Sequence, residues 1–228
     1  MKTLILELSG GKTFPLAKWG TAMKVLLLKL LNEYNDKYPE LISLAEHTHK
    51  TKKWDMGVMP SYNPAPYTCE LQGCKPGCLL KNSEPAKDRQ CYFLDGNDNF
   101  VAEIQYAKYV KLKSQWIVYR RFFINEPNRI IELAFGSNFE DSTDANLDSA
   151  SITTLTSFHP TARYSLLNTG EYVETLYKYD TDTISSITEN IWRETFTTRH
   201  YKIKNTNDDL TILEILPDNI KTPVYPES

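Results

Sequence analysis

The stretch from Cys91 to Tyr106 reads CYFLDGNDNFVAEIQY, two alternating segments separated by a polar turn. Its apolar residues occupy every second position on each side of the turn Asp95-Gly96-Asn97-Asp98-Asn99. A repeat of two is the side-chain period of a β-strand with one buried face. Asp, Asn and Gly tolerate the positive φ angles of a tight hairpin turn. The stretch therefore predicts a β-hairpin.

The same pattern of an aromatic strand, a polar turn and an aliphatic strand recurs later in the chain. The copies are Arg121 to Phe135, Leu176 to Ile187 and His200 to Ile215. Their spacing is irregular, whereas solenoids and propellers repeat at a fixed period. We expect a meander of related hairpins in one antiparallel sheet.

The amino-terminal part predicts helices. Between Ala17 and Tyr34, large apolar residues recur at helical spacing, and the face they form is wide enough to be covered by a sheet. A shorter helix is expected from Glu40 to Glu46, and a hairpin strand from Thr3 to Leu8 precedes both. The expected class is α+β, a mainly antiparallel β-sheet of aromatic hairpins with an N-terminal helical part.

The pattern divides the chain into three parts, which can form one continuous domain. Residues 1–60 hold the N-terminal hairpin and helices, 61–90 an irregular segment that contains cysteines, and 91–228 the antiparallel β meander. With 228 residues and 41% hydrophobic content, the chain can bury one sizeable core or two small ones. A formal net charge of −3 argues against general nucleic-acid binding, which usually requires a basic face.

Two observations bear on location. The first apolar run is broken by Glu7 after four residues, which is too short for the apolar region of a signal peptide. No stretch approaches the roughly 20 apolar residues of a membrane span. We therefore expect a cytoplasmic protein without a membrane partner.

All four cysteines lie in or next to the irregular segment, with the spacing C-x4-C-x3-C-x12-C. They are Cys69, Cys74, Cys78 and Cys91. Four thiolates suit a tetrahedral structural zinc, although zinc knuckles usually contain tighter C-x2-C pairs. An iron–sulfur cluster and free thiols are the alternatives. If zinc binds, we expect it to hold the segment on the sheet and to play no catalytic role.

An acidic stretch is the candidate for partner binding. Its carboxylates are Glu140, Asp141, Asp144 and Asp148. Asp144, Asn146 and Asp148 resemble the start of a calcium loop, but the glycine and the final glutamate of that motif are replaced by Ser149 and Leu155. The stretch is expected either to be a solvated loop or to contact a basic partner, whose association carboxylates would accelerate.

Residues with catalytic or nucleic-acid-binding chemistry are few. His159 and His200 have no recognisable nucleophile or carboxylate motif around them. An enzyme would require one of them to meet carboxylates in a pocket. Between Tyr109 and Arg121, aromatic and basic residues alternate in a pattern that can bind single-stranded nucleic acid, but a strand with one wet face is the simpler interpretation. No catalytic residues are assigned.

One motif resembles a known family. Tyr177-Lys178-Tyr179-Asp180, followed by the strand residues Ile184 to Thr188, resembles the YD repeat of Rhs-type bacterial toxins, although Asp182-Thr183 replaces its turn glycine. Cytosolic proteins built from such aromatic hairpins are similar to immunity proteins of polymorphic toxin systems. The resemblance implies an immunity-type inhibitor that neutralises a cognate toxin domain by direct binding. A metal-stapled adaptor of a secretion or phage system is the alternative.

Overall fold

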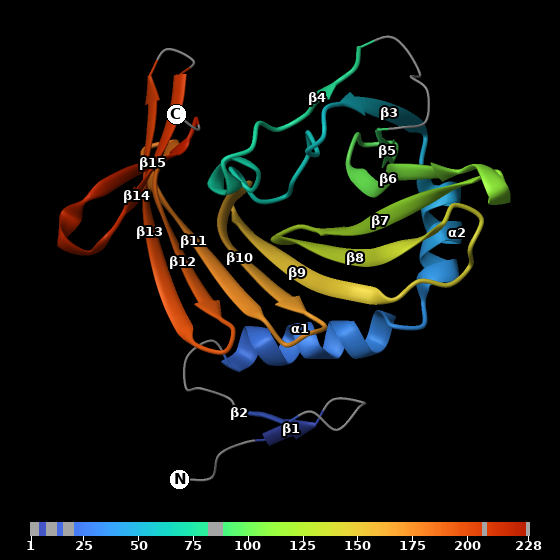
Figure 1. Cartoon of the computed structure of the whole chain (residues 1–228), viewed down its shortest axis with the longest axis horizontal. Coiled ribbons are helices and arrows are strands. Elements are labelled where there is room, and N and C mark those ends of the chain that lie inside the picture. The colour runs from blue at the N-terminus through green and yellow to red at the C-terminus, as the bar shows by residue number, and fades with distance from the viewer. Residues whose placement is uncertain (1–4, 8–12, 16–20, 82–88, 207–208, 227–228) are drawn as a thin grey trace.

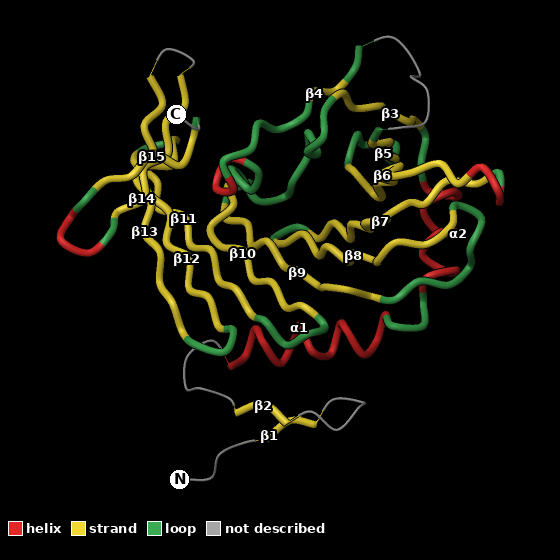
Figure 2. Tube along the Cα trace, viewed as in Figure 1, coloured by secondary structure: helices red, strands yellow, loops and turns green. Residues whose placement is uncertain are grey.

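A computed structural model describes residues 5–7, 13–15, 21–81, 89–206 and 209–226. Figure 2 shows that strands dominate the chain after the two N-terminal helices. Among the described residues, no helix has the length and apolar composition that crossing a bilayer requires. The helices are α1 (Thr21–Tyr34) and α2 (Tyr38–Thr48), with short 3-10 turns η1 (Glu70–Gln72), η2 (Lys111–Lys113) and η3 (Pro217–Asn219).

Thirteen strands form one antiparallel sheet, in which strands from β5 onward lie in chain order and β3 and β4 continue one edge. A separate hairpin pairs β1 (Ile5–Glu7) with β2 (Thr13–Pro15). The strands of the large sheet are β3 (Thr51–Met56), β4 (Cys78–Leu79), β5 (Gln90–Leu94), β6 (Phe100–Val110), β7 (Gln115–Glu126), β8 (Arg129–Phe139), β9 (Leu147–Thr156), β10 (His159–Leu167), β11 (Tyr172–Asp180), β12 (Thr183–Trp192), β13 (Phe196–Thr206), β14 (Asp209–Ile215) and β15 (Lys221–Tyr225).

The four predicted hairpins are confirmed as the pairs β5–β6, β7–β8, β11–β12 and β13–β14. The turn residues 207–208 of the last pair lie outside the described residues, as do residues 8–12 of the predicted N-terminal turn and the start of the predicted first helix. In the β11–β12 turn, Thr181 adopts a φ of 54°. This residue therefore takes the left-handed conformation that glycine usually supplies.

Alternation along the strands separates two faces of the sheet. In β8, Ile131, Leu133 and Phe135 are buried in the core that contains the helices, whereas Glu132 belongs to the polar set of the opposite face. Helix α1 contacts β9 and β10, so the predicted position across the sheet is confirmed (Figure 1). The buried leucines of α1 are Leu27, Leu28, Leu30 and Leu31.

Residues 57–80 cover the opposite face, and we call them the roof segment. Figure 1 shows this segment inside the curve of the sheet, between β3–β4 and β13–β15. Near its start, the Ser61 backbone N–H donates to Asp55 Oδ2 at 2.6 Å. Further along, Ala65 and Leu71 pack in a second core with Ile187, among other residues. The roof segment is thus fixed to the sheet at both ends.

Two predictions about element boundaries were wrong. Thr51–Met56 was assigned to a charged segment without pattern, yet it forms β3 and pairs with β5. Strands from residues 51–56, 78–79 and 90–225 therefore share one sheet, across the predicted segment boundaries. The single long strand expected from Tyr109 to Arg121 is interrupted by the η2 turn, where Ser114 has a φ of 52°. Its two parts belong to neighbouring strands, β6 and β7.

Candidate functional site

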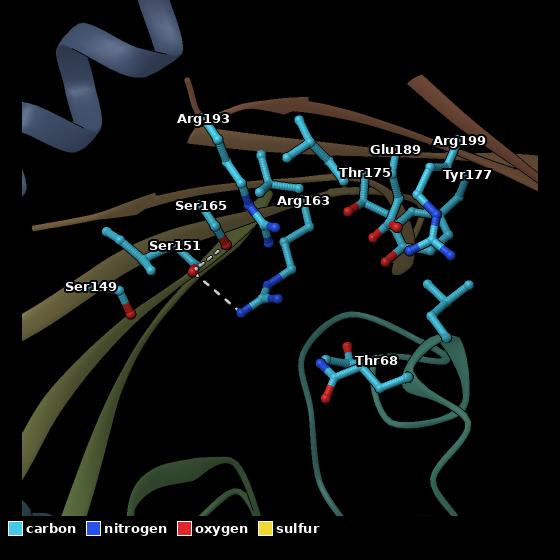
Figure 3. A pocket seen from close by; sticks show the side chains of 15 residues that line it. Thr68, Ser149, Ser151, Arg163, Ser165, Thr175, Tyr177, Glu189, Arg193 and Arg199 are labelled. Carbon is cyan, nitrogen blue, oxygen red and sulfur yellow. Dashed lines mark hydrogen bonds between the residues drawn. The ribbon is translucent and has the colours of Figure 1, made fainter. Parts of the chain in front are cut away.

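A cavity of about 310 Å³ lies between the roof segment and the strands β9 to β13. We call it the arginine pocket, because three arginines from different parts of the sheet line it (Figure 3). Hydroxyl groups and one carboxylate provide most of the other polar lining. The full lining is Thr68, Leu71, Gln72, Ser149, Ser151, Arg163, Ser165, Leu167, Val173, Thr175, Tyr177, Glu189, Ile191, Arg193 and Arg199.

The strand register brings the polar lining together. Arg163 of β10 lies opposite Thr175 of β11, which lies opposite Glu189 of β12, which in turn lies opposite Arg199 of β13. Residues directly opposite in adjacent strands point to the same face of a sheet. Four residues that are far apart in sequence therefore form one row across the floor of the pocket.

Arg163 is held in place by its Nη2 atom. This atom lies 3.2 Å from Glu132 Oε2 and 3.3 Å from Ser151 Oγ, and the Ser151 hydroxyl is 2.6 Å from that of Ser165. The Nε–H group of Arg163 is buried and finds no acceptor in the described part of the chain. The side chain therefore carries donor capacity that these contacts do not use.

The other two arginines are also ion-paired. Nε and Nη2 of Arg199 each lie 2.7 Å from an oxygen of Glu214, and Arg193 Nε lies 2.8 Å from Glu171. Glu189 accepts a hydrogen bond from the Tyr201 hydroxyl at 2.9 Å. Burial, together with the neighbouring carboxylate, raises the pKa of Tyr201 well above its usual value, so this phenol stays a donor. The pocket thus presents oriented donors beside one carboxylate.

A buried network of charges joins the pocket to the roof segment. Arg121 pairs with both Glu103 and Glu132, and Glu132 pairs in turn with Arg163. Arg121 also donates to Asn63 Oδ1 at 3.0 Å and to the Tyr62 carbonyl at 3.2 Å in the roof segment. One guanidinium therefore fixes two carboxylates and part of the roof.

Burial affects the two carboxylates of this network differently. It raises the pKa of Glu103 above its usual value, although Arg121 opposes the change. Burial also acts to raise the pKa of Glu132, but the charges of Arg163 and Arg121 together hold it below the usual value. Glu132 is consequently an anion that orients two guanidinium groups.

The predicted partner-binding carboxylates lie elsewhere, between β8 and the start of β9. Tyr106 donates to Glu140, Gln115 donates to Asp141, and Asn168 donates to Asp148. Asp141, Asp144 and Asp148 are exposed. None of the four predicted residues lines the arginine pocket.

The structure does not assemble the predicted four-thiolate zinc site. Cys91 is buried in the core beside the helices, whereas Cys78 is exposed on β4. The Cys69 thiol contacts the Pro60 carbonyl, and the Cys74 thiol contacts the Gln72 carbonyl. Within the described residues, no group of three or more His, Cys, Asp or Glu side chains is arranged to hold a metal ion.

The remaining candidates are dispersed. His159 packs against Tyr179 and His200 lies 3.2 Å from the Thr188 hydroxyl; neither histidine lines the pocket. In the predicted aromatic and basic strand, Arg120 bonds Tyr38 of α2, while Arg121 points to the roof segment on the other face. That strand therefore does not present its basic residues on one surface.

The three pocket arginines and Glu189 were not identified from the sequence. Each is a charged residue in a segment rich in apolar and hydroxyl residues, as in Thr161 to Leu167, TARYSLL. An isolated charge at a strand position of the buried face is the signal that points to such a site. Recognising it requires the strand register, which the sequence alone does not provide.

Comparison with protein-family models, with curated proteins and with solved structures found no significant match for this chain.

Proposed function

We propose that this protein acts by direct binding to another protein, as an immunity-type inhibitor that neutralises a bacterial toxin. One observation carries the proposal. The hairpin that resembles the YD repeat forms part of the wall of the arginine pocket, through Tyr177 on β11 and Glu189 on β12. The motif that suggests the protein class and the cavity that can receive a partner are therefore parts of one surface.

The fixed positions of the pocket side chains favour recognition. Arg163, Arg193 and Arg199 are each oriented by a carboxylate before any partner arrives. Ordering such long side chains on binding would cost conformational entropy, so prior ordering preserves affinity. A partner group that enters the pocket meets donors already in place.

The exposed acidic loop supports the same function in a different way. Its carboxylates would speed the approach of a basic partner without entering the pocket. The alternative, a metal-stapled adaptor, draws no support from the dispersed cysteines, and we do not pursue it.

Affinity purification tests the proposal. The tagged chain is incubated with lysate of its native host, and the retained proteins are identified by mass spectrometry and assayed for toxicity with and without added chain. We expect one retained protein whose toxic activity falls when the chain is added. Retention of proteins whose activity the chain leaves unchanged would refute the inhibitor function.

A further inference from the structure

We propose that the arginine pocket is a carboxylate-binding site and that Arg163 is its principal donor. The identity of the carboxylate as an acidic side chain or chain end of a protein partner rests on the proposed function. The binding chemistry itself rests on the contacts in the pocket.

The first step concerns the donors that remain after folding. A guanidinium group has five N–H bonds, and the hydrogen bonds of Arg163 to described residues involve only Nη2. A buried N–H group without an acceptor, such as Nε of Arg163, is unfavourable in a folded protein. A ligand oxygen that brings a small shift of this side chain would supply the missing acceptor.

The second step concerns the hydroxyl groups around Arg163. Ser149, Ser165 and Thr175 line the same cavity, and Figure 3 shows Ser165 and Thr175 in the strands beside Arg163. Each hydroxyl can donate one hydrogen bond. A carboxylate has about four lone-pair positions, so one guanidinium and neighbouring hydroxyls suit it well.

The third step concerns charge. The three arginines are paired with Glu132, Glu171 and Glu214, and Glu189 adds a fourth carboxylate at the pocket wall. The pocket therefore offers strong directional donors but no excess of positive charge. A monoanion is better suited to it than a phosphate dianion, which would be repelled more strongly by these carboxylates.

The fourth step concerns size. A volume of about 310 Å³ lies at the lower end of the range for small-ligand pockets. It has room for one acidic side chain or a chain end, which matches a group presented by a protein.

Nuclear magnetic resonance of the arginine Nε–H groups provides the test. The full chain, labelled with ¹⁵N, is titrated with N-acetylglutamate, with N-acetylglutamine as the uncharged analogue, and with inorganic phosphate. The signal of Arg163 is identified by its absence in R163Q. We expect a saturable shift of this signal with N-acetylglutamate, at least about tenfold weaker binding of N-acetylglutamine, and no tighter binding of phosphate.

Variants then locate the site. R163Q should weaken N-acetylglutamate binding by at least about tenfold, because a charge-assisted hydrogen bond is lost. T175V keeps the side-chain shape and should weaken binding by a few fold, which gives a second measurement if R163Q folds poorly. R129Q removes a different ion-paired arginine, at the β7–β8 turn, and should leave binding unchanged.

Three results would each overturn the site: no saturable shift, equal binding of N-acetylglutamate and N-acetylglutamine, or tighter binding of phosphate. Unchanged affinity in both R163Q and T175V would do the same. These titrations contain no partner protein. Binding of N-acetylglutamate in a chain that inhibits no toxin would therefore uphold the carboxylate site and reject only the proposed function.

Discussion

Replacement of Arg121 by methionine tests whether the buried charges hold the roof segment on the sheet. Glu103 is only 3% exposed, and in the described structure Arg121 is the cation paired with it. Breaking a buried ion pair by removing one partner costs about 3–5 kcal/mol. Glu132 keeps Arg163 as a partner, so the uncompensated charge falls on Glu103. We therefore expect the free energy of unfolding to fall by about 3–5 kcal/mol near neutral pH.

The assay is urea unfolding at several pH values. Burial already raises the pKa of Glu103 in the folded state, and loss of Arg121 should raise it further. When the folded-state pKa of a carboxyl exceeds its unfolded value, the folded state binds more protons between the two values, so stability falls as pH rises through this window. The loss caused by the Arg121 replacement should thus be smaller in mildly acidic buffer than at neutral pH.

Two further variants control this measurement. A double variant with Glu103 also replaced by methionine removes both charges and should recover much of the lost stability. Replacement of Arg129 removes a more exposed pair with Glu126 and should cost less than about 1 kcal/mol. A loss below about 1 kcal/mol for the Arg121 replacement, or a double variant no more stable than the single one, would refute the reasoning.

Three other predictions concern single features of the structure. Phe158 is 91% exposed with a φ of 68°, so F158G should raise thermal stability, by about 1 kcal/mol; a lower melting temperature would contradict the strain. Hydrogen bonds from Arg199 hold the pKa of Glu214 below its usual value, so this pair stabilises the fold above the usual carboxyl pKa and the effect is lost on acidification; E214Q should flatten the acid limb of stability against pH, whereas an unchanged limb would exclude the effect. Charge reversal of the acidic loop should slow association with a basic partner and reduce its salt dependence in stopped-flow experiments, and an unchanged rate would exclude the loop; the residues to reverse are Glu140, Asp141, Asp144 and Asp148.

Local patterns account for the part of the fold that the sequence predicted. The hairpin at Cys91 to Tyr106 and the helix ending at Tyr34 are encoded by side-chain period and turn residues within short windows. Strand β3 was missed because three of its six residues, Lys52, Lys53 and Asp55, are charged. Asp55 is fully buried, and its hydrogen bonds to the roof segment and Tyr92 offset its burial.

The pocket could not be predicted because it depends on contacts between distant segments. Arg163, Glu189 and Arg199 meet only through the register of four neighbouring strands, and residue 68 reaches them from the roof segment. The cysteine spacing illustrates the opposite limit. Cys91 was grouped with three earlier cysteines by proximity in sequence, but the alternation of β5 places it in the core on the helix side.

The most direct test of the account is a titration of the captured toxin's activity with the wild-type chain, R163Q and R129Q. The account predicts complete inhibition at one equivalent of wild type and of R129Q. It predicts that R163Q requires at least about tenfold more protein, because the partner's carboxylate loses a charge-assisted hydrogen bond. Equal inhibition by wild type and R163Q would contradict the claim that the partner is recognised through the arginine pocket.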